Sequence, residues 1–147
     1  AFIAQRGFER FTKALEKAWN EGEPDRLTDF KAVGQAYLAF ARKEPAYYAA
    51  MFEERLSDAH TRARARSGDD AFNVLREAAE VLIDTLPDKK RPPAMMVALH
   101  VWSMAHGMAT LFGGDRKSRK AIPMEPEDLL EAGVLVYLDG LGFSQTP

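Results

Sequence analysis

Two histidines, His100 and His106, lie in the longest uncharged stretch of the chain, which runs from Ala94 to Phe112. Imidazole ligates metals and transfers protons, so these residues are the first candidates for chemistry. On a helix, however, His106 shares a face with Trp102, whereas His100 shares a different face with Met104. The two imidazoles therefore diverge and cannot ligate one metal through this segment alone. We expect no metal site and no cofactor.

Catalytic motifs are absent from the sequence. Ser103 lies near both histidines, but nothing in the sequence supplies a third group that orients either imidazole, and there is no nucleophile elbow or phosphate loop. The chain has no cysteine, which excludes thiolate catalysis, cysteine-based zinc sites and a disulfide framework. We therefore predict that the protein is not an enzyme and that it is cytoplasmic.

Composition predicts a single domain over residues 1–147, because a chain of 147 residues can bury a core without disulfides. The 20 Lys and Arg against 22 Asp and Glu lack the basic excess of a free-standing nucleic-acid binder. The first residues show no export signal. Since the chain does not begin with Met, we expect a fragment or a processed chain.

Apolar residues spaced three and four apart predict helices along almost the whole chain. The expected helices cover residues 2–20, 25–43, 45–56, 71–86, 93–112 and 126–141, and most are bounded by Pro or Gly. Residues 57–70 contain three arginines and no apolar period, so we predict a solvated loop, with a phosphate-contacting patch as the alternative. The fold class is an all-α, six-helix antiparallel bundle.

The uncharged helix 93–112 is apolar around its whole circumference and must be covered on every side. Three environments can cover it: a lipid bilayer, the chain's own core, or that core on one side and a second subunit on the other. Mid-helix histidines and amphipathic neighbouring helices argue against the membrane. We expect a homodimer through the last two helices, with a monomer as the alternative. The expected interface residues are Leu111, Leu130, Val134, Tyr137, Leu138 and Leu141.

The segment Trp102-Ser103-Met104-Ala105-His106-Gly107 resembles the WHG-type C-terminal regulatory domain of TetR/AcrR-family transcriptional regulators. Residues 30–52 resemble the family's paired helices around a Glu-Pro step, and residues 5–10 resemble the helix that leaves its DNA-binding domain. The resemblance implies a ligand-sensing and dimerisation domain of a regulator, expected to be a repressor. The family's N-terminal helix-turn-helix domain has no counterpart in this sequence, so DNA would be bound only through that missing domain.

The resemblance implies a pocket for an apolar or aromatic small molecule between the helices, where aromatic and Met side chains adapt to a ligand. The candidate ligand-binding residues are Phe11, Tyr37, Tyr48, Met51, Phe52, Phe72, Met96, His100, Trp102, Met104 and His106. The alternative for His106 is a buried neutral imidazole with one or two hydrogen bonds. The alternative for the whole chain is a helical dimerisation module without a small-molecule ligand. The sequence leaves open which face of helix 93–112 lines the pocket.

Overall fold

The computed structural model describes residues 2–53, 58–112 and 123–143, with side chains for residues 6–51, 70–112 and 123–143. Within these residues the chain forms six α-helices and two short 3-10 turns, and no strand. The helices are α1 (Phe2–Trp19), α2 (Arg26–Lys43), α3 (Pro45–Glu53), α4 (Asp58–Ile83), α5 (Ala94–Phe112) and α6 (Pro126–Gly140). The predicted all-α, six-helix fold is confirmed.

Three helix starts follow from local chemistry. The Asp25 carboxylate caps α2 by accepting a hydrogen bond from the Thr28 backbone N–H at 3.1 Å. Pro45 and Pro126 each open a helix, where the missing N–H of proline costs nothing. Glu127 follows in the first turn of α6, at the positive end of the helix dipole.

The predicted loop over residues 57–70 is wrong for residues 58–70, because α4 already begins at Asp58. A helix needs an apolar face to pack against a core, but it can form without one. Residues 58–70 are rich in Ala and Arg, which favour the helical conformation. The arginine side chains behind the phosphate-patch alternative lie outside the described residues. So do residues 54–57, expected to end the third helix, and most of the expected connector between α5 and α6.

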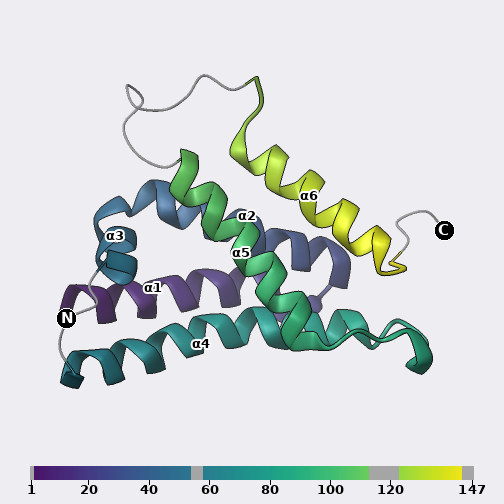
Figure 1. Ribbon diagram of the computed structural model, residues 1–147, viewed down its shortest axis with the longest axis horizontal. Helices are drawn as coiled ribbons and strands as arrows, with labels where there is room; N and C mark the ends of the chain where they lie inside the picture. Colours follow the sequence, from purple (N-terminus) through teal and green to yellow (C-terminus); the bar gives the residue numbers. More distant parts are fainter. Residues whose placement is uncertain (1, 54–57, 113–122, 144–147) are drawn as a thin grey trace.

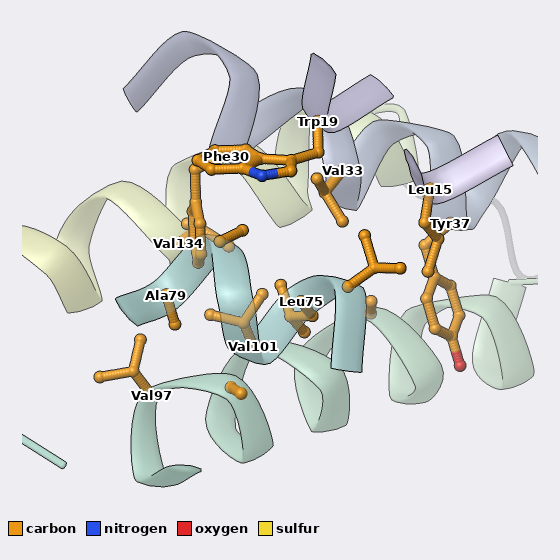
Figure 2. Close-up of a cluster of buried hydrophobic side chains, with 14 of the residues drawn as sticks. Leu15, Trp19, Phe30, Val33, Tyr37, Leu75, Ala79, Val97, Val101 and Val134 are labelled. Atoms are coloured by element: carbon orange, nitrogen blue, oxygen red, sulfur yellow. The ribbon is translucent and has the colours of Figure 1, made fainter. Parts of the chain in front are cut away.

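Helices α1 and α5 each pack against three other helices. Helix α1 contacts α2, α3 and α4, while α5 contacts α2, α4 and α6. Figure 1 shows α1 and α4 running side by side, α5 crossing the bundle at an angle, and α6 lying along the outer side. Figure 2 shows the buried side chains between these layers, which come from α1, α2, α4, α5 and α6. Helices α2 and α5 therefore join the inner core to the outer helix α6.

Helix α6 is seated closely on α2. A Cβ atom on Gly34 would lie 3.2 Å from Leu130 Cδ2, so a side chain at this position would require Leu130 to shift by a few tenths of an ångström. The Lys31 ammonium lies 3.3 Å from the Glu131 carboxylate, and Gln35 Nε2 donates to the Glu127 backbone oxygen at 3.0 Å. The position of α6 is thus set by apolar packing with polar contacts along the same edge.

This seating corrects part of the expected dimer interface. Leu130, Val134 and Leu138 are 1%, 4% and 1% exposed, so their side chains belong to the chain's own core. Sequence spacing shows that these residues share a helix face, but not which surface that face meets. Tyr137 and Leu141 are partly buried against the core, and Leu111 is 72% exposed.

Candidate functional site

A three-membered polar cluster lies where α2, α3 and α5 meet. The Tyr48 hydroxyl is 2.8 Å from His106 Nδ1, and the Tyr37 hydroxyl is 3.1 Å from the same nitrogen. The two hydroxyl oxygens are also 3.1 Å apart. Each group is therefore within hydrogen-bond distance of the other two.

Each helix contributes one member of this cluster. The buried Tyr37 comes from the middle of α2, and His106 comes from the second half of α5. Tyr48 reaches them because α3 starts at Pro45, only two residues after α2 ends at Lys43. Helix α3 therefore places Tyr48 beside the last turns of α2, which is the preceding helix in the chain.

An aromatic wall borders the cluster on the side of α1 and α4. The ring centroid of Trp102 lies 5.9, 5.3 and 5.5 Å from those of Phe11, Tyr37 and Phe72, in edge-to-face arrangements. Phe11 also meets Tyr37 edge to face at 4.9 Å. Such geometry is the favourable one for aromatic rings, so the wall is well packed. Trp102 lies one helical turn before His106, which joins the wall to the polar cluster.

Burial keeps all three polar groups uncharged. It raises the pKa of the Tyr37 hydroxyl above its usual range and lowers the pKa of the His106 imidazole. It also raises the pKa of Tyr48 to about 12, although hydrogen bonds with Tyr37 and Thr110 act to lower it. At neutral pH the cluster therefore consists of two phenols and a neutral imidazole, which suits hydrogen bonding to a ligand.

The structure brings together six of the expected site residues, and Met51 is 3% exposed beside Gly7 of α1. The six are Phe11, Tyr37, Tyr48, Phe72, Trp102 and His106. The side chain of Phe52 lies outside the described residues. The inner face of α5 is the one that carries Trp102 and His106.

The remaining three expected residues are not brought to this cluster, which corrects the expectation of one shared site. His100 is exposed, and its Nδ1 lies 2.8 Å from the Tyr137 hydroxyl of α6. Met104 faces Gly133 of α6, and Met96 lies on that same side of α5. The reason is helical geometry, because α5 turns these side chains away from α2 and α3.

Thr110 is a site residue that the sequence reasoning missed. Its side chain makes a hydrogen bond with the Tyr48 hydroxyl. The signal was present, because Thr110 lies four residues after His106 and so shares its helix face.

Among the described residues, no group of three or more His, Asp or Glu side chains is placed to hold a metal. The largest of the surface hollows described lie away from the cluster. One, of about 490 Å³, includes Leu82 and Phe143, and the other, of about 400 Å³, lies between α1 and α2 at Ala36 and Phe40. The cluster of Tyr37, Tyr48 and His106 is thus the one place where polar groups converge inside aromatic walls in the described part of the chain.

These features define a helical-bundle domain with an inner polar cluster bordered by aromatic rings. Residues 30–137 match the family model described as the Tetracyclin repressor-like C-terminal domain. This match spans most of the 147 residues, so the chain belongs to that family, and its resemblance to TetR-type regulators is confirmed. No curated protein and no solved structure is significantly similar to the chain.

Membership of this family makes the chain a domain of a transcription regulator, and such a domain is expected to be soluble. Helix α5 is long and apolar enough to cross a membrane, with a mean hydropathy of 1.3, and 28% of that window is buried in the chain. One helix of this kind is weak evidence for a membrane protein, since core helices of soluble domains have the same composition.

Proposed function

We propose that this chain is the ligand-sensing and dimerisation domain of a TetR-like transcriptional repressor. The observation that carries the proposal is that α5 makes buried aromatic and polar contacts while other apolar side chains of the same helix stay exposed. Its inner face holds Trp102 and His106 in the aromatic and polar cluster. Met95 and Leu99, which continue the same stripe toward the N-terminal end of α5, are about half exposed, and Leu111 on the opposite side is 72% exposed. One helix therefore serves both a candidate ligand site and a candidate subunit contact.

The ligand half of the proposal is supported by the composition of the inner cluster. An apolar or aromatic small molecule would pack against rings such as Phe11 and Trp102, while the Tyr48 and His106 groups would set its orientation. Both Tyr48 and His106 are only partly buried, so the cluster is approachable from the side of α3 and α5.

The dimer half is supported by apolar side chains that the single chain leaves uncovered. Val136 of α6 is 74% exposed, and it adds to the exposed Leu99 and Leu111 of α5. Apolar area of this kind is stabilised by about 25 cal/mol for each Å² removed from water. A second copy that presents the same two helices would cover the patch isologously.

Coupling between the two halves would run through α5. A ligand that favours one packing of the inner face shifts the population of bundle conformations, and the outer face moves with the helix. The spacing of DNA-binding domains attached to the two subunits would then change. DNA would be contacted by those separate N-terminal domains and not by this chain.

The ligand half is tested by a thermal-shift screen of uncharged apolar and aromatic compounds. A compound present at about one hundred times its Kd stabilises the folded state by about 2.7 kcal/mol. The variant Trp102→Phe removes part of the aromatic wall, so it should bind the stabilising compounds more weakly. A screen that stabilises nothing contradicts the sensing role.

The dimer half is tested by light scattering after chromatography on Leu99→Glu and Val136→Glu. Each introduces a charge into the exposed patch and should convert a dimer to a monomer without unfolding it. Ala46→Glu, at an exposed position of α3, is the matched control and should remain dimeric. A wild-type chain that is monomeric at high concentration contradicts this half of the proposal.

The alternative is a dimerisation module without a small-molecule ligand. One observation favours this alternative. Phe11 is fully buried and Tyr37 is 2% exposed, so the cluster is already closely packed at these two residues. A dimeric chain combined with a silent ligand screen would select this alternative.

A further inference from the structure

The hollow between α1 and α2 has an apolar floor and the size of a small-molecule site. The floor consists of the buried Phe40 and three partly buried alanines, Ala14, Ala36 and Ala39. An alanine side chain ends at Cβ, so the two helices leave a space here that longer side chains would fill. The volume of about 400 Å³ falls within the range of roughly 300–1,000 Å³ that is usual for sites of small ligands.

Charged side chains surround this apolar floor, and most of them are positive. Arg10 and Lys13 of α1 and Lys43 of α2 supply three positive charges, while Glu44 supplies one negative charge. The Glu44 carboxylate lies 3.3 Å from the Arg10 guanidinium, so it is already paired. The rim of the hollow therefore carries a net positive charge, which complements an anion.

Lys43 is the cation of this rim that meets the least competition. Lys13 also borders a smaller neighbouring hollow that contains Glu9 and Glu16. Lys43 is exposed and makes no ion pair within the described part of the chain. It lies three residues after Phe40, so it continues the same face of α2 beyond the apolar floor. Lys43 is therefore placed to bind an anionic group whose apolar part lies on Phe40.

The floor and the rim are held in place by their own neighbours. The ring centroid of Phe40 lies 5.1 Å from that of Phe11, which is fully buried in the core. The Arg10 guanidinium carbon lies 5.1 Å from the centre of the Tyr47 ring, in addition to its contact with Glu44. A preformed surface costs less ordering when a ligand binds. The hollow can therefore accept a ligand without rearrangement of these side chains.

We propose that this hollow binds an amphipathic carboxylate, with its apolar tail on Phe40 and the alanines and its carboxylate paired with Lys43. The apolar floor requires a tail, since an inorganic anion would leave the floor uncovered. The positive rim requires an anionic head, since it repels a cation and gains no ion pair from an alcohol. The site is separate from the cluster of Tyr37, Tyr48 and His106, so it goes beyond the proposed function and does not depend on it.

The tail and the head are tested by calorimetric titration of the wild-type chain. The probes are hexanoate, octanoate and decanoate, below their micelle concentrations, with decylammonium as the matched cation. Each added CH₂ that reaches the floor should tighten binding by roughly three- to fourfold. Decanoate should bind at least about fivefold more tightly than decylammonium at low salt, and added salt should narrow this difference.

The site is located with one charge variant and one variant that fills the hollow. Lys43→Glu should weaken the binding of decanoate about fivefold and remove its advantage over decylammonium. Ala39→Leu should weaken both probes, because the longer side chain occupies the floor. Lys89→Glu, in the exposed 3-10 turn Asp88–Lys90, and Ala46→Leu, at an exposed position of α3, are the matched controls and should bind like wild type.

Equal binding of decanoate and decylammonium, no gain with tail length, or no binding of any carboxylate overturns this inference. So does an affinity for decanoate that neither Lys43→Glu nor Ala39→Leu changes. An affinity that falls in Trp102→Phe but not in Ala39→Leu places decanoate in the inner cluster and also overturns it. If light scattering shows that Lys43→Glu dissociates a dimer, a second copy covers the hollow and the inference fails. Silence of the uncharged library bears only on the sensing role.

Discussion

Each of the two histidines of α5 forms a pair with a tyrosine of another helix. The nitrogen–oxygen distance is the same in the two pairs, but their surroundings are very different. His106 Nδ1 lies 2.8 Å from the Tyr48 hydroxyl, and His100 Nδ1 lies 2.8 Å from the Tyr137 hydroxyl. The first pair has Tyr37 as a third member and lies beside the aromatic wall. The second joins the exposed edges of α5 and α6.

This comparison shows that burial, and not distance, decides what a hydrogen bond is worth to the protein. At the exposed pair, water replaces a lost partner at little cost. In the buried cluster, a lost partner leaves a polar group unsatisfied in a medium of low dielectric constant. The loss of a partner should therefore cost more stability at the inner pair than at the outer pair, which joins α6 to α5.

The largest expected effect concerns the wall beside the inner pair. Trp102→Ala removes a ring that contacts Phe11, Tyr37 and Phe72, and it should lower the free energy of unfolding by about 3 kcal/mol. Urea denaturation followed by circular dichroism measures this loss. Trp102→Phe should retain part of the stability. A loss below about 1 kcal/mol for the alanine variant would mean that the wall contributes little packing energy.

Removal of one hydroxyl from each pair tests the comparison directly. Tyr48→Phe should cost about 1–2 kcal/mol, because Tyr37 and His106 lose a buried partner. Tyr137→Phe should cost under about 0.5 kcal/mol, since water is available at the outer pair. The same denaturation experiment measures both variants. Equal losses would break the comparison.

The inner histidine should also make stability depend on pH. Burial lowers the pKa of His106 in the folded state, so the unfolded chain binds more protons at mildly acid pH. The contribution is complete above the unfolded pKa of about 6.5 and is lost as the pH falls through it toward the folded value. Denaturation at several pH values should show a smaller acid loss for His106→Gln than for wild type. An identical pH profile for the two proteins would contradict this role of burial.

The smallest expected effect is seen at alkaline pH. Burial raises the pKa of Tyr48 to about 12, so its phenolate should form later than that of an exposed tyrosine. The stability contributed by the buried neutral hydroxyl of Tyr48 is present below the unfolded pKa of about 10. This stability is lost as the pH rises from there toward 12. A phenolate absorbance titration should lose the step near pH 12 in Tyr48→Phe, because the pKa of Tyr37 is raised still further and Tyr37 stays protonated there. A late step that persists in the variant would place it on another tyrosine.

The expected helices and the aromatic set were largely recoverable from the sequence. Spacing placed Trp102 and His106 on one face of α5, and the structure keeps that relation. Thr110 belongs to the same face and went unrecognised. The assignment of His100 to the same site failed, because a list of site-like residues carries no information about which neighbour each face meets.

The sequence by itself determined the six helices, most of their ends and the face that each residue occupies, because these depend on contacts within a few residues. Only the tertiary structure decided which faces meet. It buried Leu130 and Leu138 of α6 in the chain's own core and left Val136 exposed. It also brought Tyr48 to His106, although these residues are 58 positions apart. Such pairings depend on how whole helices pack, and local spacing does not encode that choice.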